Sequence, residues 1–254
     1  AVLGEFGGLG LRVEGHVWAK ESWGYRGMAD KESLTRRYVE LLSKVWGLKD
    51  SPGLSAAVYT QTTDVETECN GLMTYDRALV KPDAEKVAAA NRGKIEAMPQ
   101  PRVIVPCALD DRVFWRYTFT KPSDDWFKPN FDDSSWKEGR AGFGTKDTPG
   151  ASARTEWNTS DIWLRRVFEL GDVKLIAPRL MLHHDEDAEI YINGVLAARV
   201  KGHITDYEEV EMTAEGRAAL KPGKNVFAVH CHQTKGGQYI DVGIVDTPEA
   251  SGKR

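Results

Sequence analysis

The residues best suited to chemistry lie near the N-terminus, where a carboxylate ends the first strand-like run. Glu5 stands between Gly4 and the pair Gly7-Gly8, just after the apolar start of the chain. Glycines let a ligand or another backbone approach closely, and in a parallel α/β barrel the carboxyl ends of the strands form the active site. Glu5 is therefore a candidate catalytic carboxylate. Taken alone, the same residue is more simply interpreted as a solvated strand end.

Aromatic and hydrogen-bonding side chains accompany both of the first two predicted strands. Sugars present apolar C–H faces together with hydroxyl groups, so aromatic rings beside carboxylates and amides suit a saccharide subsite. The glycine-rich loop over residues 7–27 carries His16, Trp18, Trp23 and Tyr25, and the end of the second strand carries Tyr59, Gln61, Asp64 and Glu66. We predict that these side chains bind substrate. Packing against the protein is an equal alternative for the loop aromatics, and a hydrogen-bonded loop histidine is the ordinary role for His16.

Two histidine-containing clusters raise the question of a metal site. In His183-His184-Asp185-Glu186-Asp187, adjacent strand residues face opposite sides and the acidic run falls at a turn. We interpret this segment as a solvated hairpin in preference to a metal cluster. His230-Cys231-His232 places both histidines on one strand face, but no third or fourth zinc ligand is evident. We therefore predict core or edge histidines there and no metal site.

Tryptophans of the second half admit two roles, a sugar-binding platform or packing. Large aromatic residues in a β-sandwich more often anchor the core and its loops. We therefore prefer packing for Trp136 and Trp163, and both roles stay open for Trp126 and Trp157.

The composition restricts the class of protein. The chain has 254 residues, enough for one large domain or two ordinary ones, with 34 basic and 38 acidic side chains and a formal charge of -4. No basic patch suits nucleic acid, and no stretch suits a membrane span. Three distant cysteines predict buried free thiols. Because residue 1 is alanine and no signal peptide precedes the first strand, we expect the chain to begin partway through a longer protein.

The elements that must position these residues change in type near the middle of the chain. Apolar residues recur at helical spacing from Leu34 to Val45, with Asp30 as the predicted N-cap and Gly47 at the end. Residues 54–60 predict a parallel strand that is buried on both faces, which completes a βαβ unit. Residues 83–97 predict a second helix, and the prolines at 99 and 101 mark a domain boundary.

From about residue 103 the period changes from 3.6 to 2, and turn residues separate short β-rich runs. Asn193-Gly194 is a preferred type I′ hairpin pair, since both residues need positive φ. Residues 129–154 form a long strand-poor excursion. The predicted strands cover residues 113–120, 161–170, 179–184, 188–193, 195–200, 207–212, 225–233 and 238–245. This count favours a sandwich of the jelly-roll type.

Several of these segments together resemble the end of the catalytic barrel in family 2 glycoside hydrolases. The resemblance covers about the first third of the chain, and a looser one links the second half to the galactose-binding-like jelly roll of many such enzymes. The barrel motifs are GEFGG at 4–8, HVW at 16–18, WGY at 23–25, YTQTTDVE at 59–66 and NGLMTYDR at 70–77; the sandwich motifs are FDDSSW at 131–136, IWLRR at 162–166 and IYING at 190–194.

By this resemblance the first third supplies the seventh and eighth β/α units of a (β/α)8 barrel, and Glu5 is the nucleophile. Family members also carry an Asn-Glu pair at the end of the fourth barrel strand, whose glutamate is the general acid/base. No such segment stands in this sequence. A retaining mechanism needs both carboxyl groups, so half of the catalytic pair is absent. For Asp64 and Glu66 a subsite or structural role is preferred to a catalytic one.

We thus predict an α/β barrel remnant, the last two β/α units of a TIM barrel, followed by an all-β jelly-roll sandwich. The predicted limits are 1–82 for the barrel part, 83–102 for a helix and proline-bounded linker, 103–246 for the sandwich and 247–254 for a flexible tail.

The predicted function is the C-terminal portion of a retaining glycoside hydrolase that acts on a β-linked saccharide and is inactive alone. Two alternatives stay open, a non-catalytic carbohydrate-binding sandwich and a structural accessory domain. The two-carboxylate mechanism requires no cofactor, and the predicted partner is a carbohydrate, with no nucleic acid and no membrane span. The sugar, the oligomeric state and the compartment are left open, although a polysaccharide-degrading parent would be expected outside the cell or in the periplasm.

Overall fold

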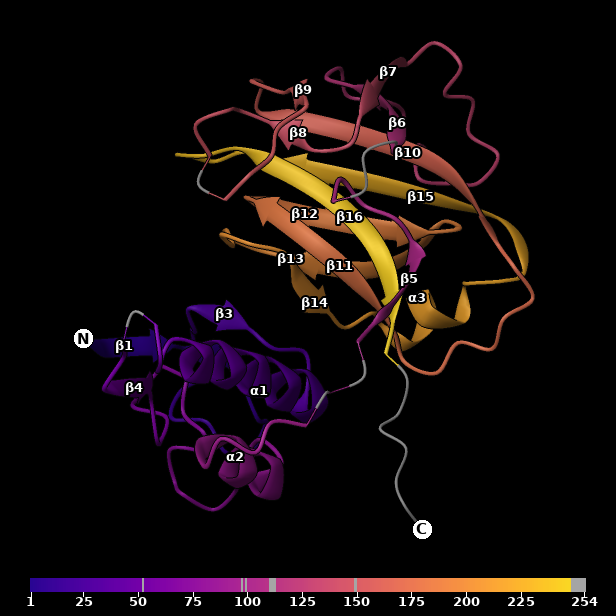
Figure 1. Cartoon of the computed structure of the whole chain (residues 1–254). Coiled ribbons are helices and arrows are strands. Elements are labelled where there is room, and N and C mark those ends of the chain that lie inside the picture. The colour runs from indigo at the N-terminus through magenta and orange to yellow at the C-terminus, as the bar shows by residue number, and fades with distance from the viewer. Residues whose placement is uncertain (52, 97, 99, 110–112, 149, 248–254) are drawn as a thin grey trace. The chain divides into compact units, whose positions relative to one another are not determined.

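The computed structural model describes residues 1–51, 53–96, 98, 100–109, 113–148 and 150–247. The chain divides into two compact units, Ala1–Pro99 (unit 1) and Gln100–Arg254 (unit 2). Most of the regular structure is β-sheet, and the longest helix belongs to unit 1 (Figure 1). Of the predicted flexible tail at 247–254, residues 248–254 lie outside the described residues. In the part of the chain that the structure describes, no helix is both long and apolar enough to span a bilayer.

Unit 1 is built around a βαβ element, as predicted. Strand β1 (Val2–Gly7) pairs in parallel with β4 (Ala56–Thr60), and α1 (Lys31–Gly47) connects them. Asp30 is the N-cap of α1: its side chain accepts a hydrogen bond from the Ser33 backbone, and Ser33 reciprocates in a capping box. Two short strands, β2 (Leu9–Gly10) and β3 (Arg26–Gly27), also pair in parallel within the long loop.

Two expectations for unit 1 are wrong in detail. Strand β4 was expected to be buried on both faces, but Val58 is 54% exposed, because β1 and β4 form a two-stranded sheet in the described residues. The second helix, α2 (Ala84–Asn91), is shorter than predicted. It begins at the N-cap Asp83 and stops before Gly93, whose φ of 75° a helix cannot continue.

Unit 2 is a β-sandwich of two six-stranded sheets. The first sheet has the order β13 (Val195–Val200), β12 (Asp187–Ile192), β15 (Gly223–His232), β10 (Asp161–Leu170), β6 (Phe114–Thr118) and β7 (Lys137–Arg140). The second has the order β14 (Glu208–Val210), β11 (Pro178–Asp185), β16 (Tyr239–Asp246), β8 (Phe143–Gly144) and β9 (Thr155–Glu156), with β5 (Arg102–Val105) also beside β16. All eight predicted strands are present, and the short strands β5, β7, β8 and β9 are additional.

The sandwich core lies between the two sheets and follows the alternation of the sequence. Phe227, Val229 and Cys231 of β15 face Leu180 and Leu182 of β11 in one buried cluster. The hairpin between β12 and β13 turns at Asn193 and Gly194, whose φ values of 50° and 86° confirm the predicted turn. A short helix, α3 (Ala214–Ala218), follows β14.

The outer face of the first sheet carries an aromatic cluster that is separate from the sandwich core. Trp126 packs with Trp163 and Ala228, and Trp136 is partly buried against them. Buried Arg165 fixes the covering loop, because its Nε donates to Asp133 Oδ2 over 2.8 Å and its Nη1 donates to the Trp126 carbonyl over 2.5 Å. Packing is thus the role of these tryptophans, and Trp157, left open by the sequence, is fully buried in the main core.

The interpretation of residues 183–187 as a solvated hairpin is wrong. His183, His184, Asp185 and Glu186 are all buried, because β11 lies inside its sheet between β14 and β16. Burial lowers the pKa of both histidines. Among the residues that the structure describes, no group of three or more histidine, cysteine or acidic side chains is arranged to hold a metal ion.

Candidate functional site

Glu5 occupies a β-bulge near the carboxyl end of β1. Leu3 lies opposite Ala57 and Phe6 lies opposite Tyr59, so β1 has one more residue than β4 over this stretch. A bulge turns side chains away from the regular alternation of a strand, and bulges are frequent beside active sites. Glu5 is exposed, and its carboxylate has no hydrogen-bond partner among the described residues.

The glycines that follow Glu5 leave room for two tyrosine rings. A Cβ on Gly7 would lie 2.3 Å from Tyr59 Cε2, and one on Gly8 would lie 2.6 Å from Tyr25 Cδ2. Both glycines also have positive φ, which other residues adopt reluctantly. Tyr59 accepts a long hydrogen bond of 3.4 Å from the Leu9 backbone, and burial raises the pKa of Tyr59. The groups that approach the glycines beside Glu5 closely are therefore the side chains of Tyr59 and Tyr25.

The two groups of predicted substrate residues lie on neighbouring segments of unit 1. The backbone N–H of Gly8 donates to the Thr60 carbonyl over 2.9 Å, and that of Trp23 donates to the Thr67 carbonyl over 2.8 Å. These hydrogen bonds align the long loop with the segment that follows β4. The fold thus brings His16, Trp18, Trp23 and Tyr25 into the same unit as Tyr59, Gln61, Asp64 and Glu66.

The loop aromatics form two exposed pairs. Trp23 and Tyr25 are in edge contact with ring centroids 5.1 Å apart, and Trp18 contacts Tyr75 in the same way at 5.7 Å. Trp18 and Tyr25 remain more than half exposed, at 61% and 62%. Rings held by one neighbour and open to solvent on the other side are available to stack on a ligand.

His16 is fixed by a carboxylate that the sequence did not single out as its partner. Its Nδ1 lies 2.8 Å from Asp76 Oδ2. Hydrogen bonds from Thr74, His16 and the Ala78 backbone lower the pKa of Asp76 to about 2. The pair orients the His16 ring at the rim of the loop.

Asp64 is part of a buried ionic contact. Lys81 Nζ donates to Asp64 Oδ1 over 2.7 Å and to the carbonyls of Leu11 and Cys69 over 2.9 and 2.8 Å. The Lys81 side chain is inaccessible to solvent. Asp64 also accepts from the Gly71 backbone, and burial raises its pKa although Lys81 opposes the shift. Of the two roles open for Asp64, subsite or structural, the contact with Lys81 supplies a partner for the structural one, and a lone lysine gave no signal of it in the sequence.

The remaining predicted residues differ in their surroundings. The side-chain nitrogen of Gln61 is buried without a hydrogen-bond partner, whereas Glu66 is exposed at a position with a φ of 52°. Asn70, which begins the NGLMTYDR motif, is fully buried. Its Oδ1 accepts from the Tyr25 backbone over 3.1 Å, and its Nδ2 donates to Glu68 over 2.9 Å. Asn70 therefore ties the aromatic loop to the segment after β4.

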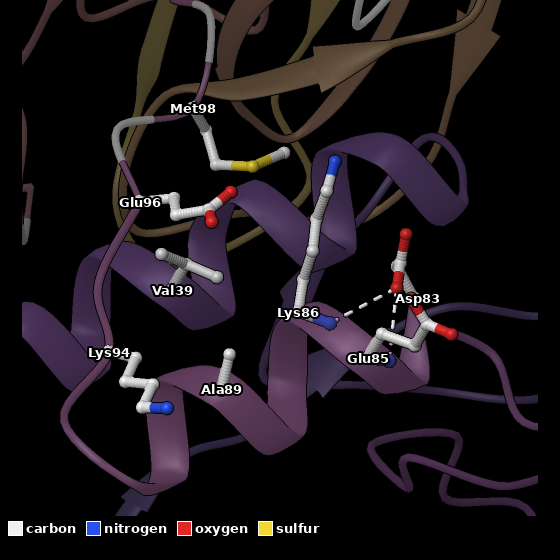
Figure 2. A pocket seen from close by; sticks show the side chains of 8 residues that line it. All are labelled: Val39, Asp83, Glu85, Lys86, Ala89, Lys94, Glu96 and Met98. Atoms are coloured by element: carbon white, nitrogen blue, oxygen red, sulfur yellow. Dashed lines mark hydrogen bonds between the residues drawn. The ribbon is translucent and has the colours of Figure 1, made fainter. Parts of the chain in front are cut away.

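The cavity shown in Figure 2 lies elsewhere in unit 1, between α1 and α2. It has a volume of about 330 Å³ and contains none of the predicted site residues. Its lining includes the exposed charged residues Glu85, Lys94 and Glu96. Such a lining is typical of a solvated groove between helices.

Comparisons with known proteins give structural similarity alone. No family model and no curated protein matches the chain. Among solved structures, a glycosyl hydrolase family 2 member from Bacteroides cellulosilyticus is 18% identical with a TM-score of 0.37, over 52% of this chain and 20% of that one. A beta-glucuronidase from Bacteroides uniformis is 20% identical with a TM-score of 0.39, over 59% and 18%. A beta-glucuronidase from an uncultured Clostridium sp. is 14% identical with a TM-score of 0.37, over 61% and 30%.

The structural neighbours thus include family 2 glycosyl hydrolases, and this chain spans less than a third of the length of each of these three.

Proposed function

We propose that unit 1 supplies part of the active site of a retaining glycoside hydrolase, with Glu5 as the nucleophile. The observation that carries the proposal is the exposed Glu5 carboxylate on a β-bulge near the carboxyl end of β1, within a parallel βαβ element. Parallel α/β enzymes place their catalytic residues at this end of the strands. The GEFGG motif that surrounds Glu5 is also one of those that resemble family 2 glycoside hydrolases.

In this mechanism a Glu5 oxygen attacks the anomeric carbon of a β-linked sugar while the bond to the leaving oxygen breaks. A second carboxylic acid protonates that oxygen, and it later removes a proton from the water that hydrolyses the glycosyl ester. Asp64, Glu68 and Asp76 are each held by a hydrogen-bond partner, and the exposed Glu66 is not part of an Asn-Glu pair such as carries the acid in the family that this chain resembles. We therefore assign the acid/base to a segment outside this sequence.

The exposed aromatic pairs suit the sugar-binding part of such a site. Trp23, Tyr25 and Trp18 offer ring faces to the apolar side of a pyranose. His16 offers a ring nitrogen to its hydroxyls, and Gln61 and Glu66 lie on the segment that follows β4. Tyr59 and Asp64 act in this proposal by shaping the site, since both are bound to other parts of unit 1.

Covalent trapping tests the nucleophile. In the longer enzyme that we propose, a 2-deoxy-2-fluoroglycosyl fluoride should label the peptide that contains Glu5, as detected by mass spectrometry. Glu5→Gln should abolish the label and reduce turnover of an aryl glycoside by at least about 10³-fold, because the nucleophile is lost while its shape is retained. The exposed Glu32 provides a matched control, and Glu32→Gln should leave both unchanged. Labelling of another residue, or normal turnover by Glu5→Gln, would refute the assignment.

This chain by itself should hydrolyse no aryl glycoside at a measurable rate. General acid–base catalysis contributes about 10²–10⁴-fold, and the acid is missing from the proposed site. Turnover by the purified chain that disappears in Glu5→Gln would contradict the assignment of the acid/base to another segment.

A further inference from the structure

The outer face of the second sheet of unit 2 holds a buried histidine and a buried aspartate at directly opposite positions. His183 of β11 pairs with Asp241 of β16 in the antiparallel ladder, and the two residues are 0% and 2% exposed. Their neighbours Leu182 and Val242 belong to the core, so alternation puts His183 and Asp241 on the other face. Directly opposite residues of an antiparallel pair have Cβ atoms about 4.5–5.5 Å apart, which brings both side chains into one polar cluster.

Each of these two side chains has one buried hydrogen-bonding atom without a partner among the described residues, Asp241 Oδ1 and His183 Nδ1. The other carboxylate oxygen, Asp241 Oδ2, accepts from the Tyr207 hydroxyl and from the Ala108 backbone, both over 2.6 Å. His183 Nε2 lies 3.1 Å from the Ile204 carbonyl, and because a carbonyl only accepts, Nε2 carries the hydrogen. His183 Nδ1 therefore has a lone pair when the ring is neutral. Buried polar atoms are nearly always paired, yet these two acceptors on opposite residues both lack a donor.

Two tyrosines pack against the pair. The ring centroids of Tyr207 and Tyr239 lie 5.3 and 4.5 Å from that of His183, and the two tyrosine hydroxyls are 3.1 Å apart. Tyr207 thus contacts both members of the pair, His183 through its ring and Asp241 through its hydroxyl. A net charge is costly in such a buried environment. The uncharged state of the pair, with one proton on it and a neutral imidazole, is therefore favoured.

The electrostatic surroundings favour the same state. Burial is the largest effect on both groups, and it raises the pKa of Asp241 and lowers the pKa of His183. Arg166 opposes the first shift and Asp206 opposes the second, each by less than burial contributes. Both directions leave the proton on Asp241. The titratable or charged groups around this cluster, besides the two tyrosines, are His184, Asp206, Arg166, Arg154 and Cys107.

We propose that His183 and Asp241 form a pH-sensitive switch, in which Asp241 Oδ1 holds a proton and donates it in a hydrogen bond to His183 Nδ1. With this proton in place both atoms are paired, and the hydrogen bonds to Tyr207 and Ile204 fix residues 203–207 on the sheet. As the pH rises the proton leaves to solvent, two acceptors are left beside a buried charge, and the segment 203–207 is held less tightly. The switch belongs to unit 2 and requires neither Glu5 nor a sugar.

A pH titration of the full chain followed by NMR tests the switch, over about pH 4–9, which includes the raised values documented for buried carboxyl groups. The Nδ1 resonance of His183 and the carboxyl-carbon resonance of Asp241 should change with one common midpoint, because groups that share a proton titrate as a pair. The Ile204 backbone donates to the His184 carbonyl over 3.0 Å. Its hydrogen-exchange protection factor, which is corrected for the intrinsic effect of pH on exchange, should fall by about tenfold as the pH rises through that midpoint.

Asp241→Asn supplies a donor that does not depend on pH. Its carbonyl oxygen can accept from Tyr207 and Ala108 while its amide nitrogen donates to His183 Nδ1. The protection factor of the Ile204 amide should then stay constant across the titration. Asp172 is an exposed aspartate of the same unit, and Asp172→Asn should keep the pH dependence of the wild type.

The other outcomes would overturn the switch. These are separate midpoints for the two resonances, resonances that stay constant over the whole range, a long-lived water that contacts His183 in nuclear Overhauser spectra, or an Ile204 protection factor without a step. Should Asp241→Asn fail to fold, the two measurements on the wild type decide alone. Glu5→Gln should leave the titration unchanged, so failure here is distinguishable from failure of the proposed nucleophile.

Discussion

The two units of the chain bury their sheets to different extents. In unit 2 both sheets share one apolar core, and Val229 at its centre is 0% exposed. In unit 1 the two-stranded sheet leaves Val58 54% exposed, and Val2 is also exposed. A sandwich covers each sheet with the other, whereas a short parallel sheet needs further neighbours to cover both of its faces.

Buried cations also act differently in the two units. Lys81 joins three separate segments of unit 1 through Leu11, Asp64 and Cys69. Arg165 of unit 2 fixes one covering loop onto a sheet whose core lies on the other face. Unit 1 therefore combines a buried ionic contact between three segments with an apolar cluster around α1 that includes Leu34 and Leu42, whereas the core between the sheets of unit 2 is apolar.

Of the substitutions considered, removal of the Lys81 ammonium group should reduce the stability of the protein most. Lys81→Met leaves Asp64 buried without its cation, and breaking a buried ion pair from one side costs about 3–5 kcal/mol. Hydrogen exchange of the α1 amides should report this loss, while the β15 amides stay protected. The exposed Lys20 is the matched control, and Lys20→Met should change neither. A loss below about 1 kcal/mol would show that Lys81 is not essential to unit 1.

A matched pair of valine substitutions tests the difference between the sheets. Val229→Ala removes fully buried methyl groups and should cost about 2–3 kcal/mol, as measured from hydrogen exchange of the β15 amides. Val58→Ala acts at a half-exposed position and should cost less than about 0.5 kcal/mol, as measured at β4. Equal losses at the two positions would mean that the exposed face of β4 is covered in solution.

The smallest effect on stability is expected from the exposed pair of His16 and Asp76. Because the folded-state pKa of Asp76 is about 2 and its unfolded value is roughly 3.9, its hydrogen bonds stabilise unit 1 above that unfolded value. This contribution is lost as the pH falls through about 2. Thr74→Val removes the hydrogen bond that lowers the pKa most, so the carboxyl carbon of Asp76 should titrate at higher pH in NMR spectra. Thr62→Val is the control and should leave the titration unchanged.

Sequence patterns correctly predicted the elements that depend on interactions between residues close together in the chain. The capping residue Asp30 and the Asn193-Gly194 turn lie where the sequence places them, because caps and tight turns depend on a few adjacent residues. The eight predicted strands of unit 2 were found from their short β-rich runs between turn residues, and in β12 the burial alternates along the strand because one face of its sheet meets the core. Short strands such as β8 were missed because two residues carry no periodic signal.

Burial was the quantity that local patterns predicted badly. The sequence of residues 183–187 predicted a solvated hairpin, yet β11 lies between β14 and β16 in its sheet. The sequence of residues 54–60 predicted a strand buried on both faces, yet in the described residues β4 pairs only with β1. In both cases the degree of burial depends on neighbours that are distant in sequence, which a pattern within one segment cannot specify.

For the candidate sites, the sequence by itself determined which residue types are present and what chemistry they offer. It placed Glu5 among glycines and predicted aromatic rings and carboxylates for a sugar. Only the tertiary structure decided which carboxylates are already engaged, because Asp64 meets Lys81 across 17 residues of sequence. It alone also placed the Asp185 carboxylate beside the glycine loop that follows β15. Hydrogen-bond partners are chosen by position in space, and position in space is set by the packing of the whole unit.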